Sequence, residues 1–259
     1  MGRLSGRFIA VTGAAQGIGR AIAADFRAEG ADLFLIDLDA GMLSATVADL
    51  RALPGGAIHQ AEADISDGAR IATVFAEAAK AAGRALDGLV NNAGVNVFHA
   101  PLETSDAEWR RAFAINLDGA WACARAVLPG MIARKHGVIL NIASTHAFTI
   151  IPGTFPYPVA KHALLGLTKS LALEHAAGGI RVNAIAPGYV ATQKVIDWWA
   201  THPDPEAAKA GTMALHPQGR IATPEEIARA AVFMISDECP FMTAACLTID
   251  GGLSVRQHA

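Results

Sequence analysis

The chain has 259 residues, a net charge of −3, 52% hydrophobic residues and 17% charged residues. This length fits one large α/β domain, and the high hydrophobic content excludes a disordered chain. There is no basic excess to neutralise phosphates, so the composition argues against nucleic-acid binding. The apolar runs are too short to cross a membrane. Three cysteines without paired spacing favour a reducing, cytoplasmic compartment and argue against a metal site.

Short runs rich in Val, Ile and Leu alternate with longer, Ala-rich stretches of helical period. Strand runs this apolar are typical of a parallel sheet that helices cover on both faces. The alternation predicts β-α-β crossovers and a single-domain α/β fold with a doubly wound, seven-stranded parallel sheet. The predicted strands are 8–12, 32–37, 57–63, 88–91, 138–143, 181–186 and 245–249, and the predicted helices are 17–29, 39–52, 67–82, 105–134, 157–177 and 223–236.

One irregular stretch, about 188–222, separates the sixth predicted strand from the last predicted helix. Pro203, Pro205 and Pro217 interrupt the pattern there. Long loops in compact domains are usually functional, so a lid over a substrate site is the favoured interpretation. An ordinary surface excursion is the alternative.

A glycine-rich turn follows the first predicted strand and opens the first predicted helix. Gly13, Gly17 and Gly19 carry no Cβ, which allows a pyrophosphate to approach the backbone and the helix N-terminus. Asp37 ends the next strand, 18 residues after Gly19, where a carboxylate can meet the adenosine ribose hydroxyls. A carboxylate there repels a 2′-phosphate, so NAD is favoured over NADP. The alternative is that Asp37 caps the following helix.

Tyr157 and Lys161 are four residues apart, so they share one face of a helix. Pro156 and Pro158 flank the tyrosine and indicate that the helix begins there. A phenol has an ordinary pKa of about 10, and a neighbouring ammonium group and the helix dipole both stabilise phenolate. The pair therefore predicts a tyrosine acid/base whose pKa Lys161 lowers, although Y-x-x-x-K alone also occurs by chance.

Further polar residues follow the predicted strands at the same edge of the sheet. Ser144 closes the strand 138–143, where its hydroxyl can hold a substrate oxygen, and the segment 91–94 (N-N-A-G) follows the fourth strand. Asn116 falls in the middle of the predicted helix 105–134, where asparagine is unfavourable. This position indicates a kink or an internal hydrogen bond, with an exposed helix residue as the alternative.

The nucleotide-binding segments resemble those of the short-chain dehydrogenase/reductase family, and the match covers nearly the whole chain. Residues 12–19 resemble its T-G-x-x-x-G-x-G turn, 91–94 its N-N-A-G segment, 187–192 its P-G…T segment, and 64–65 the pair that holds adenine. The resemblance implies a Rossmann fold that binds NAD. The implied cofactor contacts are Gly13, Gln16, Gly17, Ile18, Gly19, Asp37, Asp64, Ile65, Asn91, Ala93, Gly94, Tyr157, Lys161, Pro187, Gly188, Val190 and Thr192.

Asn116, Ser144, Tyr157 and Lys161 fall on the catalytic tetrad of that family in order and spacing. The resemblance implies that Tyr157 is the acid/base and that Ser144 positions the substrate. It also implies that Lys161 lowers the tyrosine pKa and binds the nicotinamide ribose, while Asn116 holds a water of a proton relay. A homotetramer built on the helices 105–134 and 157–177 and the C-terminal strand is implied as well. Ala160 replaces a frequent serine, without consequence for the tetrad.

The candidate substrate contacts combine amide and imidazole donors with aromatic faces, which suits a polyhydroxylated molecule. Ser144-Thr145-His146 and the position of Asn96 resemble the bacterial glucose 1-dehydrogenases. This resemblance implies an aldose 1-dehydrogenase that transfers hydride from C1 to NAD and gives a lactone, with L-arabinose, L-rhamnose or L-fucose as examples. The predicted contacts are Asn96, Ser144, His146, Tyr157 and Trp198, and further candidates are His99, Phe148, Thr154, Phe155, Gln193, Trp199 and His202.

Some of these residues and the function itself have alternatives. His146 can instead bond a backbone carbonyl, His99 can be a loop residue, and only one of Trp198 and Trp199 can face a pocket, since they are adjacent. A secondary-alcohol or polyol dehydrogenase, or a 3-oxoacyl-thioester reductase, is the second hypothesis. Asp37 argues against the reductase, because such enzymes generally use NADPH. A sensor that binds NAD without turnover is the third, and the complete tetrad argues against it.

Overall fold

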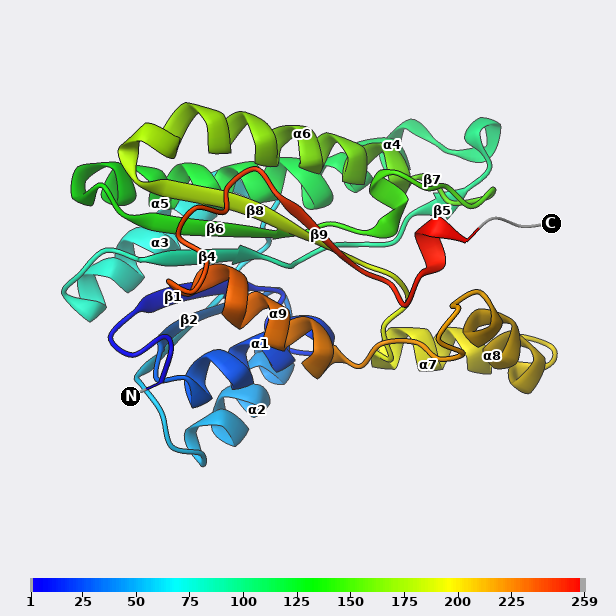
Figure 1. The fold of residues 1–259 in the computed structure, drawn as a ribbon, viewed down its shortest axis with the longest axis horizontal. Coiled ribbons are helices and arrows are strands. Elements are labelled where there is room, and N and C mark those ends of the chain that lie inside the picture. The colour runs from blue at the N-terminus through cyan, green and yellow to red at the C-terminus, as the bar shows by residue number, and fades with distance from the viewer. Residues whose placement is uncertain (1, 257–259) are drawn as a thin grey trace.

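The computed structural model describes residues 2–256 and contains a seven-stranded parallel sheet between two layers of helices (Figure 1). All seven predicted strands are confirmed, with ends that shift by one residue at most. The order across the sheet is β3-β2-β1-β4-β6-β8-β9. The strands are β1 (Phe8–Thr12), β2 (Asp32–Asp37), β3 (Ile58–Glu62), β4 (Gly88–Asn91), β6 (Gly137–Ile142), β8 (Ile180–Pro187) and β9 (Cys246–Ile249).

Helices cover both faces of the sheet, as the alternating pattern predicts. One layer holds α1 (Gly17–Ala28), α2 (Ala40–Arg51) and α9 (Pro224–Ile235), and the other holds α3 (Gly68–Ala82), α5 (Gly119–Arg134) and α6 (Tyr157–His175). The strand residues divide between the layers by their alternation. Ile9 and Val11 of β1 belong to the first apolar cluster, and Phe8 and Ala10 belong to the second. Each large apolar side chain buried in this way contributes roughly 1.5–3 kcal/mol.

The strand order reverses beside β1, which pairs with β2 on one side and with β4 on the other. In an open α/β sheet, ligands bind at such a reversal, beyond the carboxyl ends of the strands. The turn after β1, the N-N-A-G segment after β4 and Ser144 after β6 all lie at this edge. The fold therefore brings together residues that are far apart in the sequence.

The predicted helix 105–134 is interrupted at its centre. α4 (Asp106–Phe113) leads through a π-helical turn (Ala114–Asp118) into α5, and Asn116 lies in that turn. Its Nδ2 donates to the carbonyls of Ala112 at 2.9 Å and Val95 at 3.0 Å, and its Oδ1 accepts from the N–H of Val95 at 3.3 Å. Of the two expectations for Asn116, a kink or an internal hydrogen bond, the internal hydrogen bond is confirmed, and it lies in a π-helical turn.

A small second sheet, which the sequence pattern does not reveal, lies next to the start of α6. β5 (Phe98–His99) pairs antiparallel with β7 (Phe155–Pro156), and Tyr157 follows directly. Two-residue strands are too short to produce a periodic signal. This pairing fixes the loop after β4 against the segment that carries the candidate acid/base.

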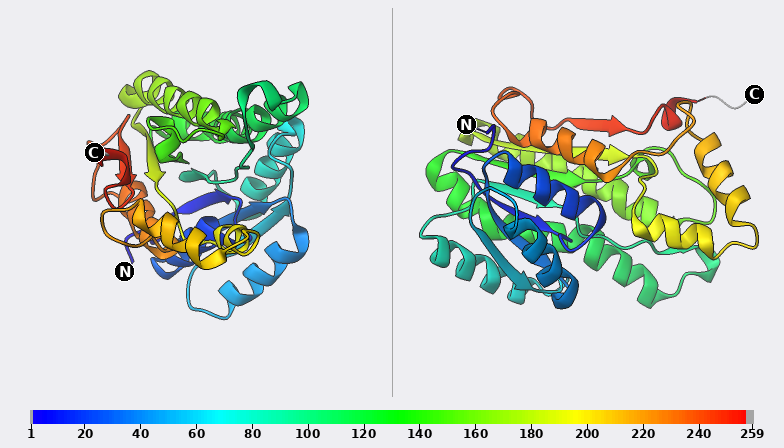
Figure 2. Two further views of the ribbon diagram at one scale, coloured as in Figure 1. Left: turned by 90° about the vertical axis from the view of Figure 1, so that its right-hand side faces the viewer. Right: turned by 90° about the horizontal axis from the view of Figure 1, so that it is seen from below.

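The stretch 188–222 is not irregular, and that part of the prediction is wrong. It contains α7 (Gln193–Ala200) and α8 (Pro205–Ala214), which project at the strand-end side of the sheet (Figures 1 and 2). Both helices are short and mostly exposed, and the prolines between and after them mask their period. The two ends of the excursion are held together, since Ala191 N–H donates to the Ala222 carbonyl at 2.8 Å.

Within residues 2–256, no helix is both long enough and apolar enough to cross a membrane.

Candidate active site

Two cavities adjoin at the carboxyl edge of the sheet. We call the first, of about 490 Å³, the catalytic cavity, since Ser144, Tyr157 and Lys161 line it. We call the second, of about 690 Å³, the dinucleotide groove, since the glycine-rich turn and Asp37 line it. Ile18, Asn92, Gly94 and Thr192 line both of them.

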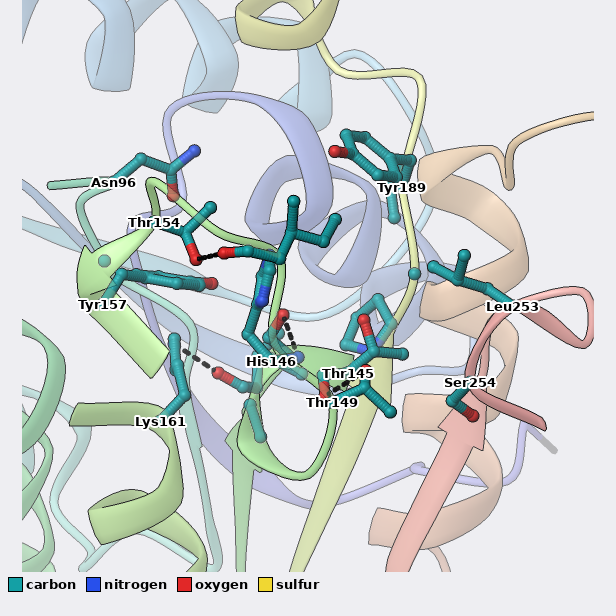
Figure 3. Close-up of a pocket in the computed structure, with 18 of the residues that line it drawn as sticks. Asn96, Thr145, His146, Thr149, Thr154, Tyr157, Lys161, Tyr189, Leu253 and Ser254 are labelled. Carbon is teal, nitrogen blue, oxygen red and sulfur yellow. Dashed lines mark hydrogen bonds between the residues drawn. The ribbon is translucent and has the colours of Figure 1, made fainter. Parts of the chain in front are cut away.

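Tyr157 is the first residue of α6, and its side chain points into the catalytic cavity (Figure 3). Burial raises the pKa of Tyr157 to about 12, and a hydrogen bond with the Ser144 side chain acts in the opposite direction. Ser144 is fixed in turn, because its Oγ accepts the His146 N–H at 3.2 Å and caps the short helix Thr145–Ala147. The two hydroxyls can therefore face one substrate oxygen.

Lys161 lies one helical turn after Tyr157 and is buried. Its Nζ donates to the Ile142 carbonyl at 2.9 Å and lies 5.6 Å from the centre of the Tyr157 ring. Burial lowers the pKa of Lys161 to about 8. The ammonium thus faces the ring and a carbonyl, and the pKa of Tyr157 is raised, not lowered. The net direction is upward because desolvation of the phenol outweighs the hydrogen bond with Ser144, and the lowering of this pKa by Lys161 stays a prediction.

The glycine-rich turn leaves no room for side chains. Gly13 has a φ of +64°, and a Cβ there would lie 2.9 Å from Ala93 Cα; a Cβ on Gly19 would lie 2.0 Å from the Gly13 carbonyl oxygen. The N-terminus of α1 also has no side-chain cap, whereas Asp39 caps α2 and Asp67 caps α3. Free N–H groups beside a glycine cradle fit a dinucleotide pyrophosphate.

Asp37 lines the dinucleotide groove at the end of β2. Its Oδ2 accepts the Ala15 N–H at 2.9 Å, so the carboxylate also holds the glycine-rich turn in place. The cap of α2 is Asp39, whose Oδ1 accepts the Met42 N–H at 2.9 Å. The alternative interpretation of Asp37 as the helix cap is therefore wrong.

Most of the predicted cofactor contacts converge on the two cavities. Asn91 does not, since its Nδ2 donates to Asn141 Oδ1 at 2.8 Å and to the Ala120 carbonyl at 3.2 Å inside the core. Gly19 lies behind Gly13 and lines neither cavity. Asn91 and Gly19 thus hold neighbouring parts of the chain in place and do not themselves face a cavity. The predicted contacts that line the groove are Gly13, Gln16, Gly17, Ile18, Asp37, Asp64, Ile65, Ala93, Gly94 and Thr192, and those that line the catalytic cavity include Tyr157, Lys161, Pro187, Gly188 and Val190.

Asn96 and His146, two of the predicted substrate contacts, line the catalytic cavity, as does the further candidate Thr154. The His146 ring lies edge-on to Tyr157, with 5.8 Å between ring centres. Its Nδ1 is buried and has no partner of ordinary hydrogen-bond geometry among the described residues, but a hydrogen bond with the Thr149 backbone acts on the pKa of the ring, as the alternative interpretation of His146 expects. Burial lowers the pKa of His146. A neutral imidazole is therefore available to a substrate hydroxyl.

Trp198 does not line the catalytic cavity, contrary to the prediction. It stacks on Tyr189 with 6.5 Å between ring centres, and Tyr189 takes the place on the cavity wall. Trp199 is buried, and its Nε1 donates to Thr212 Oγ1 at 3.0 Å, which ties α7 to α8. His99 pairs with Glu108 at 2.9 Å. Phe148, Phe155, Gln193 and His202 also lie outside the residues that line the cavity.

Several residues of the cavity wall are not among the contacts predicted from the sequence. Tyr189 follows the P-G pair directly, so its proximity to that motif is a usable signal. The segment 253–256 has no such signal, because only the fold brings the residues after β9 to this edge. The missed wall residues include Thr145, Thr149, Tyr189, Leu253, Ser254 and Arg256. In the part of the chain that the structure describes, no three His, Cys, Asp or Glu side chains cluster as metal ligands.

Comparison with known proteins agrees with this geometry. A family model described as enoyl-(acyl carrier protein) reductase matches residues 13–254. The chain is 39% identical over 255 residues to a galactitol 2-dehydrogenase (L-tagatose-forming) of Cereibacter sphaeroides, covering 98% of this chain and 97% of the relative. It is 37% identical over 253 residues to 2-(S)-hydroxypropyl-CoM dehydrogenase 3 of Xanthobacter autotrophicus, covering 97% and 98%.

A solved structure shares the whole architecture. The aldohexose dehydrogenase of Thermoplasma acidophilum superposes with a TM-score of 0.87 at 32% identity, over 99% of this chain and 97% of that one. These relatives are named as dehydrogenases, a further relative is named as a 3-oxoacyl-[acyl-carrier-protein] reductase, and other similar structures hold NAD in one case and NADP in another. The chain belongs to the short-chain dehydrogenase/reductase family.

Proposed function

We propose that the protein is an NAD-dependent dehydrogenase that oxidises a carbinol carbon of a small polyhydroxylated substrate. C1 of an aldose, giving the lactone, is the reaction that we favour, with sugars of the L-arabinose, L-rhamnose or L-fucose type as first examples. The observation that carries the proposal is the Ser144–Tyr157 pair in the catalytic cavity, which adjoins the dinucleotide groove. Asn96 and His146 add polar groups for further hydroxyls.

The roles of the residues follow from their positions. Ser144 holds the substrate oxygen by a hydrogen bond, and Tyr157 accepts the proton of the hydroxyl that is oxidised. The oxidised nicotinamide supplies the acceptor for the hydride that leaves the same carbon. Lys161 orients the ribose beside Tyr157 and adds positive charge near the phenol. Asn116, which is held by Val95 and Ala112, positions a water that passes the proton to solvent.

We assign NAD as the cofactor because Asp37 lines the groove, where we place the adenosine ribose in this proposal. Its carboxylate can accept hydrogen bonds from two ribose hydroxyls, and it repels a 2′-phosphate. The uncapped N-terminus of α1 and the glycine cradle support a pyrophosphate beside it.

Oxidation at an internal carbon of an open-chain polyol or secondary alcohol is the second candidate. The similarity to a galactitol 2-dehydrogenase and to a 2-(S)-hydroxypropyl-CoM dehydrogenase favours it. The same Ser144–Tyr157 pair performs both reactions, and only the fit of the substrate differs. Reduction of 3-oxoacyl thioesters is disfavoured by Asp37, since that reaction generally uses NADPH.

We further propose that the enzyme is a cytoplasmic homotetramer and that residues 188–222 act as a lid. The α5 and α6 helices and β9 are the interface candidates, and the exposed Trp121 and Leu173 side chains on those helices are available for contact. The short bridge between Val190 and Ala222 gives the lid a narrow base on which to move.

The test is NADH formation by the purified protein with a panel of aldoses, polyols and simple secondary alcohols, with NADP in parallel. Turnover of a few aldoses to lactones supports the favoured reaction. Turnover of polyols or simple alcohols alone replaces it by the second candidate and removes the sugar-specific roles of Asn96 and His146. Absence of turnover with both dinucleotides across the panel would refute the proposal.

A further inference from the structure

The catalytic cavity has an uneven distribution of charge. Among the described residues that line it, Lys161 and Arg256 are cationic and none is Asp or Glu. The chain as a whole carries a net charge of −3, so the cationic lining does not reflect the composition. A cleft lined by charges of one sign focuses its field and concentrates ligands of the opposite sign.

Lys161 is not available to a remote substrate group. Its Nζ donates to the Ile142 carbonyl at 2.9 Å and lies over the Tyr157 ring, where the proton is transferred. The remaining cation of the lining is Arg256, which follows the short helix Leu253–Val255. Any selectivity for substrate charge away from the reacting carbon therefore depends on Arg256.

Most N–H donors of the Arg256 guanidinium have no hydrogen-bond acceptor among the described residues. Its Nη1 donates to the carbonyl of Ala214, the last residue of α8, which fixes one side of the group. A guanidinium has five N–H donors, and this contact uses one of them. None of the ion pairs among residues 2–256 includes Arg256. The carboxylate of the same segment, Asp250, is engaged with the N–H groups of Gly252 and Ser254 and does not line the cavity.

The segment that carries Arg256 lies opposite the reacting groups. Figure 3 shows Tyr157 and Lys161 on one side of the cavity and Leu253 and Ser254 on the other. Tyr189 is on that far side too, and burial raises its pKa, so its hydroxyl stays protonated and can donate. A substrate that reaches from Tyr157 to the far wall meets donors and positive charge there.

We propose that the natural substrate is a polyhydroxylated acid whose carboxylate, at the end remote from the oxidised carbon, pairs with Arg256. This inference rests on the proposed function and narrows its substrate class. If C1 of an aldose is oxidised, the substrate is a uronate; if an internal carbinol is oxidised, it is an aldonate. The carboxylate does not change in the reaction, which moves one hydride to the nicotinamide and one proton to Tyr157.

The experiment compares acids with their neutral counterparts at low ionic strength with NAD. The pairs are galacturonate with galactose, glucuronate with glucose, and galactonate with galactitol. A charge-assisted hydrogen bond to a guanidinium predicts a kcat/KM roughly 10- to 100-fold higher for the acid of the accepted pair. The difference should shrink as salt is added, because Arg256 is exposed to solvent and its charge is screened.

Arg256→Gln tests the residue directly, since glutamine keeps a donor for Ala214 and removes the charge. We expect kcat/KM for the acid to fall roughly 10- to 100-fold, mainly through KM, while the value for the neutral partner stays within about twofold. Arg256→Lys should recover part of the preference. Arg110→Gln is the matched control, because Arg110 is an exposed arginine that lines neither cavity. A loss that affects both members of a pair equally would show only a structural role for Arg256.

The failures of the two proposals are distinguishable. Suppose that the acids and the neutral compounds are oxidised with equal kcat/KM, and that Arg256→Gln changes neither value. The inference is then wrong and the proposed function stands. If no member of any pair is oxidised, the proposed function fails for these substrates. Calorimetric titration of galacturonate into the protein with NADH then tests Arg256 without turnover. Equal heats in wild type and Arg256→Gln would overturn the inference.

Discussion

The dinucleotide groove and the catalytic cavity share one edge of the sheet and four lining residues, but their remaining walls are built in different ways. The groove is formed largely by backbone, where Gly13 and Gly19 allow close approach and the N-terminus of α1 is uncapped. The cavity is formed by side chains from β6, α6, the segment after β8 and the segment after β9. The glycine-rich turn of the groove is thus encoded locally, whereas the side chains of the cavity wall depend on long-range assembly. Substitutions in the groove should therefore affect dinucleotide binding, and substitutions in the cavity should affect catalysis.

Tyr157→Phe should have the largest effect. It removes the hydroxyl that takes the proton and keeps the ring that packs against Phe98, with 5.4 Å between ring centres. We expect kcat to fall about 10³-fold, in the range typical of general acid–base catalysis. Steady-state kinetics with an accepted substrate measures this loss. Turnover at the wild-type rate would contradict the assignment of Tyr157.

Gly19→Ala should damage the groove and leave the cavity intact. The new Cβ would lie 2.0 Å from the Gly13 carbonyl oxygen, so the turn must shift, at a cost of about 1–3 kcal/mol in the free energy of unfolding. Gly211→Ala in α8 is the matched control, since no atom lies within 4 Å of its added Cβ. Denaturant unfolding of the two variants compares them. Equal stabilities would mean that the tight turn does not constrain residue 19.

The pH dependence of the reaction rate should be set by Tyr157 and Lys161 in the catalytic cavity, and not by residues of the groove. Burial raises the pKa of Tyr157 to about 12, so the phenolate fraction grows about tenfold per pH unit below that value. Oxidation should therefore accelerate from pH 6 upward, and the reverse reduction, which needs the phenol, should slow down. Burial lowers the pKa of Lys161 to about 8, so its charge is lost above that pH and the rise should flatten. A flat profile, measured where chemistry limits the rate, would argue against phenolate catalysis.

Asp37→Ala should change the choice of dinucleotide and little else. Without the carboxylate, repulsion of a 2′-phosphate disappears, and the ratio of kcat/KM for NAD over NADP should fall by about tenfold. The Ala15 N–H also loses its acceptor, so Asp37→Asn serves as a control that keeps that hydrogen bond. A wild-type enzyme that already prefers NADP would contradict our interpretation of Asp37.

Glu226→Gln should have the smallest effect, because it lies outside both regions. Glu226 closes the capping box of α9 with Thr223 and pairs with Arg220 at 2.7 Å, and these contacts lower its pKa to about 2. The ionised form therefore stabilises the fold above the ordinary carboxyl pKa, and this contribution is lost as the pH falls toward 2. We expect a loss of about 1 kcal/mol at pH 7 and unchanged kinetics. Urea unfolding at pH 7 and pH 3 measures it, and a loss that is larger at pH 3 would contradict this sign.

The sequence predicts the sheet and the groove well, because their signals are local. Apolar runs define the strands, and the turn at Gly13 and the acid at Asp37 have fixed spacings from β1. The cavity wall is harder to predict, since Arg256 reaches it only through the path of β9. Trp198 illustrates the reverse error, because its type and position suggest a contact that Tyr189 makes instead.

The helices of the stretch 188–222 and the raised pKa of Tyr157 depend on tertiary context in the same way. α7 and α8 are held by contacts such as the Trp199–Thr212 hydrogen bond, which no short-range pattern shows. The pKa of Tyr157 depends on how deeply its phenol is buried. The four-residue spacing between Tyr157 and Lys161 indicates only that a positive charge is near.

The most direct test of the separation between groove and cavity is the affinity for NADH, measured by fluorescence titration of wild type, Tyr157→Phe and Gly19→Ala. We predict that Tyr157→Phe binds NADH within about threefold of wild type, whereas Gly19→Ala binds it roughly 10- to 100-fold more weakly. Normal NADH affinity in Gly19→Ala, together with lost NADH affinity in Tyr157→Phe, would contradict the assignment of dinucleotide binding to the groove and of catalysis to the cavity.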